Sequence, residues 1–169
     1  MQFTELGIDS RLAQQLSHQG IVSPTEIQAQ AVPTAIAGHD VFAQSKTGSG
    51  KTLAFLLPAV HRIMKQKALS KRDPRALIIA PTRELATQVF NQCRLLIAST
   101  NISLVKILGG ENFNDQVKAL RKNPHIVVAT PGRLADHLSQ NTVQLNGLEL
   151  LIFDEADRML DLGFEEQLN

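Results

Sequence analysis

The sequence has little of several features that define other classes of protein. It contains a single cysteine, Cys93, which excludes an intramolecular disulfide, and its formal net charge of +1 provides no global basic field to attract nucleic acid. No apolar run approaches the roughly 18 residues that a membrane helix needs, and the stretch from Met1 to Glu5 lacks the pattern of a secretory signal. The histidines and the cysteine show no metal-ligand spacing, and no segment is repeated. These absences predict a soluble, cytoplasmic protein without a structural metal or a membrane partner.

What the sequence does contain is an alternation of apolar runs and helical patterns, in a chain of 169 residues that is 43% apolar. The runs Ala76 to Ala80 and Ile126 to Ala129 are continuously apolar, which is typical of strands covered on both faces of a parallel sheet. The order therefore predicts an α/β fold with a doubly wound parallel sheet. The strands are expected at 41–44, 76–80, 104–108, 126–129 and 148–153, and the helices between them near 51–66, 83–98, 112–122 and 131–139.

Two helices are expected before the first strand, so we expect an N-terminal helical segment over 1–38 and the sheet domain over 39–169. The first covers about residues 10–19 behind a cap at Asp9 or Ser10, with Leu12 and Leu16 inward, and the second starts near Thr25. Further along, Cys93 is predicted to be a core residue because it shares a helical face with Leu85, Val89 and Leu96.

The basic stretch from Lys65 to Arg75 is interpreted as a solvated loop, with contact to RNA as the alternative. A charge run of this kind usually forms exposed surface, and this one lies between a predicted helix and a predicted strand.

The strongest local pattern is the glycine-rich loop from Ser45 to Thr52, between an apolar run and a helical pattern. Its glycines let the backbone approach a ligand, and the helix that follows presents unpaired N–H groups and a positive dipole end to phosphate. Lys51 adds a mobile charge, and the Thr52 hydroxyl can ligate Mg²⁺. The alternative is a glycine-rich turn that caps an amphipathic helix, and Ser45 stands where the P-loop pattern has glycine. The residues expected to hold the nucleotide are Thr47, Gly48, Ser49, Gly50, Lys51 and Thr52.

Polar and glycine residues directly follow each of the predicted strands. Parallel sheets of this class bind ligands at the carboxyl ends of their strands, so these residues are expected to share one edge. They are the glycine loop, Pro81-Thr82-Arg83-Glu84, Gly109-Gly110, Thr130-Pro131-Gly132-Arg133 and Asp154-Glu155-Ala156-Asp157.

The acidic pair Asp154 and Glu155 suits hydrolysis of a nucleotide. Asp154 ends an apolar run facing the glycine loop and can grip Mg²⁺ together with Thr52, while Glu155 can orient or deprotonate an attacking water. The alternative is an acidic first turn of a helix. In addition, the carboxamide of Gln28 matches the donor and acceptor of an adenine edge, although a glutamine there is ordinarily exposed to solvent.

Taken in order, the motifs resemble those of the DEAD-box RNA helicases over nearly the whole chain. They are GIVSPTEIQ at 20–28 with Phe3 upstream, SKTGSGKT at 45–52, PTRELA at 81–86, Gly109-Gly110, TPGR at 130–133 and DEADRMLDLGF at 154–164. The resemblance implies the first RecA-like domain of an ATP-dependent RNA helicase, with ATP and Mg²⁺ as cofactors.

The resemblance also implies roles for particular residues. Phe3 would stack on adenine, Gln28 would read the adenine edge, and Asp157 would couple the nucleotide state to the rest of the protein. The implied catalytic residues are Lys51, Asp154 and Glu155. The RNA path would be lined by Pro81, Thr82, Arg83, Gly109, Gly110, Thr130, Pro131, Gly132 and Arg133.

The chemistry of these residues also suits RNA. Hydroxyl groups, glycine amides and the helix start after Pro131 can bind phosphate or ribose, and Arg83 or Arg133 can fork onto a phosphate. None of them is typical of base reading, so binding is expected to be largely independent of sequence, and 2′-hydroxyl contacts would favour RNA over DNA. For Arg83 the alternative is an ion pair with an acidic neighbour.

The sequence ends at Asn169, before the Ser-Ala-Thr motif and the second RecA-like domain of that family. We therefore expect this chain to be a monomer that neither unwinds RNA nor turns over ATP efficiently without the second domain as its partner. The other functions considered are a non-catalytic module that binds a nucleotide or a protein, and a P-loop kinase.

Overall fold

The computed structural model describes residues 2, 5, 7–18, 49–65 and 73–153, and for 18, 49–55 and 153 it describes the backbone alone. The chain forms two compact units, residues 1–66 with 93–101 and residues 67–92 with 102–169. Within the described ranges, no helix is both long and apolar enough to cross a bilayer. The helix expected near Thr25, the strand expected at 41–44 and the boundary expected near residue 38 lie outside the described residues.

In the first unit, helix α1 (Ser10–His18) and helix α3 (Ser49–Lys65) are joined through Asp9. The Asp9 carboxylate caps α1 by accepting the Arg11 N–H at 2.8 Å, and it forms an ion pair with Lys65 Nζ at 2.6 Å. The Asp9 N–H donates to His61 Nδ1 at 3.2 Å, which requires an unprotonated acceptor nitrogen. Lys65 and Arg11 hold the pKa of Asp9 far below its usual range, and burial lowers the pKa of His61. Asp9 thus ties the start of α1 to the end of α3.

The apolar spacing of both helices is explained by burial. Leu12 and Leu16, four residues apart on one face of α1, are fully buried, as predicted. Among the α3 residues with described side chains, Leu56, Leu57, Ala59, Val60 and Ile63 are buried.

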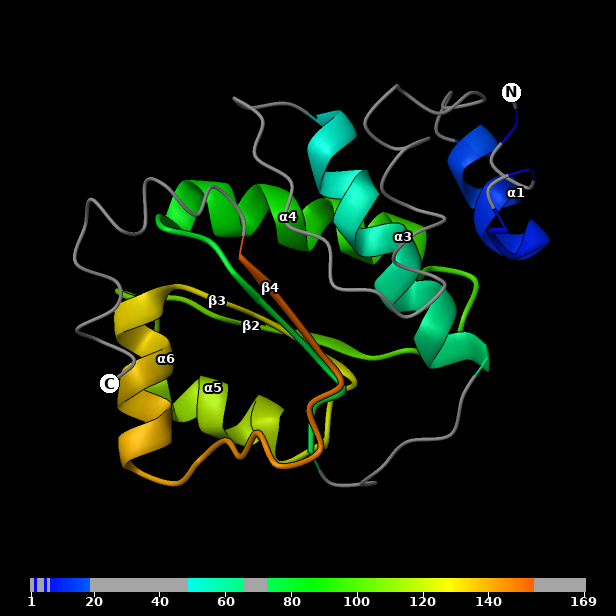
Figure 1. Ribbon diagram of the computed structural model, residues 1–169. Helices are drawn as coiled ribbons and strands as arrows, with labels where there is room; N and C mark the ends of the chain where they lie inside the picture. Colours follow the sequence, from blue (N-terminus) through cyan, green and yellow to red (C-terminus); the bar gives the residue numbers. More distant parts are fainter. Residues whose placement is uncertain (1, 3–4, 6, 19–48, 66–72, 154–169) are drawn as a thin grey trace. The chain divides into compact units, whose positions relative to one another are not determined.

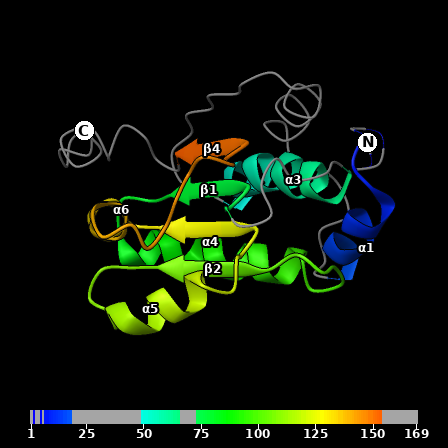
Figure 2. The same cartoon turned by 90° about the horizontal axis from the view of Figure 1, so that it is seen from below.

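Within its described residues, the second unit is built on four short parallel strands. They are β1 (Ala76–Ile79), β2 (Leu104–Ile107), β3 (Ile126–Ala129) and β4 (Leu150–Phe153), in the order β2-β3-β1-β4. In register, Ala76 of β1 lies beside Ile126 of β3 and Leu150 of β4. All four arrows point the same way in Figure 2. The parallel sheet and the α/β class predicted from the sequence are confirmed.

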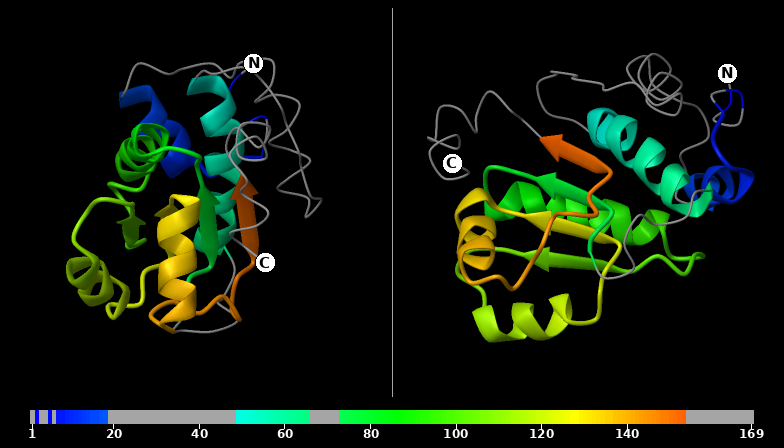
Figure 3. Two further views of the ribbon diagram at one scale, coloured as in Figure 1. Left: turned by 90° about the vertical axis from the view of Figure 1, so that its left-hand side faces the viewer. Right: turned by 60° about the horizontal axis from the view of Figure 1, so that its bottom comes forward.

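The connections explain why helices cover both faces of this sheet. The path from β1 to β2 runs across the sheet in one direction, and the paths from β2 to β3 and from β3 to β4 run in the other. Because such connections are right-handed, residues 83–92 of α4 (Arg83–Leu96) lie on one face, and α5 (Phe113–Leu120) and α6 (Pro131–Ser139) lie on the opposite face (Figures 1 and 3). The helix and strand ends predicted within the described residues lie within two residues of those observed.

The core of the second unit follows from the alternation of side chains along each strand. On the face covered by α5 and α6, alternate strand residues pack with residues from both helices and from the segment after α6. This cluster consists of Leu77, Ile79, Ile107, Leu120, Val127, Ala129, Leu134 and Val143. On the other face Ile78, Ile126 and Val128 are also buried. β1 and β3 are therefore covered on both faces, as their continuous apolar runs predicted. In α4, Val89 of the second unit is buried, and so are Cys93 and Leu96, which belong to the first unit; the buried position predicted for the cysteine is thus confirmed.

The prediction that the stretch from Lys65 to Arg75 is a solvated loop is wrong at Arg75, which is buried, whereas Lys65 is exposed but belongs to a helix. Lys65 is the last residue of α3 and pairs with Asp9, and the Arg75 side chain is only 6% exposed. The Arg75 guanidinium binds the Glu149 carboxylate through two contacts, Nε to Oε2 at 2.7 Å and Nη2 to Oε1 at 3.2 Å. Arg75 directly precedes β1 and Glu149 directly precedes β4, so the pair joins the starts of two neighbouring strands. The charge of Arg75 is thus used inside the fold, because folding brings Glu149, an acidic residue distant in sequence, beside it.

Candidate functional site

Three of the predicted motifs lie at the carboxyl ends of neighbouring strands. The ladder continues past the strand ends, since the Thr130 N–H donates to the Ile107 carbonyl at 3.3 Å and the Ala80 N–H donates to the Ala129 carbonyl at 3.0 Å. The residues that follow β1, β2 and β3 therefore emerge side by side at one edge. This edge holds 81–83, 109–110 and 130–133, as the strand order β2-β3-β1 requires.

Thr130 joins the glycine pair to the start of α6. The Gly109 N–H donates to Thr130 Oγ1 at 3.1 Å, and Thr130 has the extended backbone of an N-cap, with Pro131 at the first position of the helix. Because the hydroxyl oxygen accepts from Gly109, the hydroxyl hydrogen is available to donate elsewhere. The sequence motif Thr-Pro-Gly-Arg thus supplies both a rigid helix start and a hydroxyl that holds the neighbouring loop.

Gly110 joins the glycine pair to Arg83. Its φ is +81°, a conformation that residues with a Cβ rarely adopt, and a Cβ at this position would lie 2.8 Å from Arg83 Nη1. The guanidinium of Arg83 therefore lies directly against the bare Cα of Gly110. The Arg83 residue is exposed, and no acidic side chain of the described ranges forms an ion pair with it. The alternative of an ion pair for Arg83 has no partner in this part of the chain.

The same edge carries the N-terminal ends of two helices. In α4, Thr82 caps the first turn through Oγ1, which accepts the Leu85 N–H at 3.2 Å, and in α6 the Leu134 N–H returns to the Thr130 carbonyl. The earlier N–H groups of each helix have no acceptor within their own helix, and the positive dipole ends favour an anion. The backbone N–H groups at these helix starts, the half-buried Thr82 hydroxyl and the exposed Arg83 guanidinium together form a surface suited to phosphate, and Thr130 lies buried beside it.

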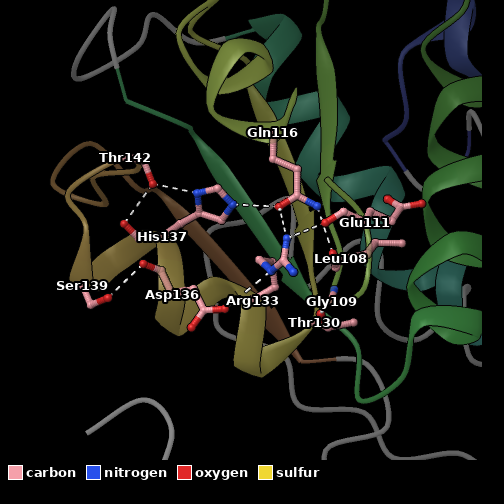
Figure 4. A network of polar contacts seen from close by, with 10 residues as sticks. All are labelled: Leu108, Gly109, Glu111, Gln116, Thr130, Arg133, Asp136, His137, Ser139 and Thr142. Carbon is pink, nitrogen blue, oxygen red and sulfur yellow. Dashed lines mark hydrogen bonds and ion pairs between the residues drawn. The ribbon is translucent and has the colours of Figure 1, made fainter. Parts of the chain in front are cut away.

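Arg133, in contrast, points into the protein. Its Nη1 donates to the Glu111 carbonyl at 2.8 Å and to Gln116 Oε1 at 3.1 Å, its Nε lies 3.5 Å from Asp136 Oδ2, and its side chain is 14% exposed. The guanidinium also lies 5.6 Å from the centre of the Phe113 ring. Figure 4 shows the contacts of Arg133 with Glu111, Gln116 and Asp136.

Gln116 is the centre of this network. Its Nε2 donates to the Leu108 carbonyl at 2.9 Å, and its Oε1 lies 2.8 Å from His137 Nε2 as well as near Arg133 (Figure 4). The Arg133 guanidinium can only donate, so the Gln116 atom that faces it must be Oε1. Because this oxygen only accepts, His137 Nε2 must carry the hydrogen of the second contact. His137 Nδ1 lies 2.6 Å from Thr142 Oγ1, whose hydroxyl donates to the His137 carbonyl at 3.1 Å.

The surroundings of His137 disfavour its charged form. It is fully buried and stacks on Phe113 with ring centres 4.1 Å apart, and burial together with the nearby Arg133 charge lowers its pKa. Sequence analysis did not identify Gln116 or His137 as site residues. The spacing of Arg133 and His137, four residues apart on α6, indicates a shared face, but the sequence holds no signal for the contact of either residue with Gln116.

Of the predicted nucleotide site, the structure describes Ser49 to Thr52, and for these residues the backbone alone. Helix α3 begins at Ser49, so Ser49 to Thr52 form its first turn, and this turn contains no acidic residue that would repel phosphate. The donor set of that turn, with its backbone N–H groups, a lysine and a threonine, therefore fits a nucleotide phosphate with Mg²⁺. The other residues predicted for this site and for coupling lie outside the described residues, namely Phe3, Gln28, Thr47, Gly48, Asp154, Glu155 and Asp157.

Comparison with known proteins assigns the chain to a family. The sequence model of the DEAD/DEAH box helicases matches residues 25–169, and the chain belongs to this family. It is 44% identical to the ATP-dependent RNA helicase DDX42 of Homo sapiens, 44% to that of Gallus gallus and 43% to that of Xenopus laevis, in each case over 167 residues. These alignments cover 98% of this chain and 18% of each relative, so the chain spans less than a fifth of the length of these relatives. The family predicted from the motifs is confirmed.

Proposed function

We propose that this chain is the N-terminal ATP- and RNA-binding half of an ATP-dependent RNA helicase that acts as a cytoplasmic monomer. The observation that carries the proposal is the meeting of three motifs at one edge of the sheet. Gly109 is bonded to Thr130, and Arg83 lies against Gly110, so residues far apart in sequence share a surface of phosphate-binding character. The family and the relatives named above support the same function.

On this surface the chain would hold the sugar-phosphate backbone of RNA. Phosphate oxygens would accept from backbone N–H groups at the starts of α4 and α6, from the Thr82 and Thr130 hydroxyls, and from Arg83. These groups do not read base edges, so affinity should depend little on sequence. Preference for RNA over DNA would rest on contacts to the 2′-hydroxyl groups.

The glycine loop and the acidic motif would hold ATP and Mg²⁺. Backbone N–H groups of the loop and Lys51 would bind the phosphates, Phe3 and Gln28 would contact adenine, and Thr52 with Asp154 would ligate the metal. Bound Mg²⁺ would supply charge neutralisation at the phosphates. Glu155 would orient the attacking water and accept its proton.

Turnover is expected only in the presence of the second RecA-like domain, with Asp157 coupling the nucleotide state to that domain. The protein would use ATP binding to distort a short RNA duplex and hydrolysis to reset the cycle.

An ATPase assay on the complete protein tests this function. Hydrolysis should rise when RNA is added, Lys51→Ala should abolish ATP binding, and Glu155→Gln should retain bound ATP while turnover stops. Nucleotide binding that RNA does not stimulate would indicate the non-catalytic module. Phosphate transfer to a small acceptor would indicate the kinase.

A further inference from the structure

We propose that Arg133 is a positioning residue rather than a contact to RNA, and that Gln116 is the shared acceptor that fixes it. This inference rests on the proposed RNA-binding function of the same edge. Of the two arginines in the described motifs, Arg83 and Arg133, it assigns the direct phosphate contact to Arg83.

The first argument is the direction in which Arg133 is used. An arginine that grips a phosphate presents its planar fork of N–H groups to the ligand. Here Nη1 is directed at two internal acceptors, the Glu111 carbonyl and Gln116 Oε1, and Nε faces Asp136. Turning the fork outward would leave the Glu111 carbonyl without this donor and would remove the guanidinium from the Phe113 ring. Each loss opposes a direct contact with RNA.

The second argument is the position of Gln116 between two motifs that face RNA. Its Nε2 holds the Leu108 carbonyl, directly before Gly109, and its Oε1 receives Arg133 and His137 of α6. Gln116 is 5% exposed, so water cannot readily replace these bonds. One buried amide thereby sets the spacing between the glycine turn and the start of α6. The N–H groups of both segments would meet the backbone of the RNA strand.

The third argument is the contrast with Arg83. Its guanidinium rests on Gly110, where no side chain stands in the way, and the residue is exposed. None of its contacts within the described ranges is an ion pair with an acidic side chain. Arg83 can therefore turn its fork to a phosphate without breaking such a pair.

Salt dependence separates a contact from a positioning role. Each phosphate neutralised on a single strand contributes about −0.7 to the slope of the logarithm of affinity against the logarithm of salt concentration. Removing a contacting arginine should therefore lower the magnitude of the slope by about 0.7, whereas removing a positioning arginine should lower affinity without this change.

The test compares four variants of the complete protein. They are Arg83→Met, Arg133→Met, Gln116→Met and, as the matched control on the exposed face of α4, Gln88→Met. Binding to a fluorescent oligouridylate is measured across a salt series with a non-hydrolysable ATP analogue present. Among the four variants, we expect only Arg83→Met to lower the magnitude of the salt slope, by about 0.7. Arg133→Met and Gln116→Met should each bind roughly tenfold more weakly with the wild-type slope, and Gln88→Met should resemble wild type.

A slope that falls by about 0.7 in Arg133→Met would overturn the inference, as would wild-type affinity in a folded Gln116→Met variant. If the substitutions prevent folding, NMR of the arginine side chains in the wild-type protein gives the same decision. Added oligouridylate should shift the guanidinium signals of Arg83 and leave those of Arg133 in place, and the reverse pattern would refute the assignment. Absence of oligouridylate binding by the wild type, in contrast, would contradict the proposed function itself.

Discussion

Replacing Gly110 by alanine adds a single heavy atom, the Cβ, and so tests the packing of the candidate RNA edge. The φ of +81° at this position costs a residue with a Cβ about 1–2 kcal/mol. Alanine also restricts the unfolded chain, which returns about 0.4–1 kcal/mol of stability. The balance is a destabilisation of about 1 kcal/mol, to which crowding of Arg83 adds little because the guanidinium is the end of a flexible side chain.

The larger effect of Gly110→Ala is expected on RNA binding. The new Cβ would lie 2.8 Å from Arg83 Nη1, closer than such atoms approach one another, so the guanidinium must move from its place on the glycine. If Arg83 contacts a phosphate from this place, the affinity for RNA falls, whereas the free energy of unfolding changes only by the cost of the backbone conformation. Both quantities are measured on the same variant, by oligouridylate binding and by urea unfolding.

The neighbouring glycine supplies the control. A Cβ at Gly109 would lie 3.9 Å from Thr130 Oγ1, an ordinary contact, and the backbone there has no positive φ. Gly109→Ala should therefore unfold with wild-type stability or slightly above it. A third variant, Gly110→Asn, separates the two effects because asparagine tolerates the left-handed region, so it should regain stability but still displace Arg83. Equal stability and affinity in both alanine variants would refute this account of the turn.

Three further outcomes are expected. Glu149→Gln should lower the free energy of unfolding by about 3 kcal/mol because it removes the carboxylate charge that pairs with the buried Arg75 guanidinium, and urea unfolding of the single variant and of Arg75→Met/Glu149→Met should show partial recovery in the double variant. Because the pKa of His137 is lowered, the folded state binds fewer protons than the unfolded state below about pH 6.5, so this stability is present above that pH and is lost as pH falls. His137→Gln should reduce the dependence of stability on pH. If the difference in stability between wild type and variant were the same at pH 7 and at pH 5, this account would be contradicted. Burial raises the pKa of the Cys93 thiol to about 12, so a thiol reagent at neutral pH should react only after urea unfolds the protein, and rapid labelling of the native protein would show that this helix opens.

Local patterns in the sequence were sufficient for the class of fold and for the positions of its elements. Continuous apolar runs predicted β1 and β3, and glycine, proline and threonine marked where strands stop. These features act within a few residues, through backbone preference and side-chain alternation, so they are readable without knowledge of the rest of the chain. The edge where the motifs meet was predicted for the same reason, because parallel strands carry the residues that follow them to one side.

The use of individual side chains was not readable in this way. Arg133 and Arg83 stand in similar motifs, yet one points to Gln116 and the other lies exposed on Gly110. Arg75 belongs to a basic stretch but is buried against Glu149, which lies 74 residues away.

Within the described residues, the sequence by itself determined the order of strands and helices, the family of the protein and the edge at which three of its motifs collect. Only the tertiary structure decided which polar groups face outward and which bind one another. The reason is that the direction of a long polar side chain depends on the acceptors packed around it, and these come from segments that only folding brings together.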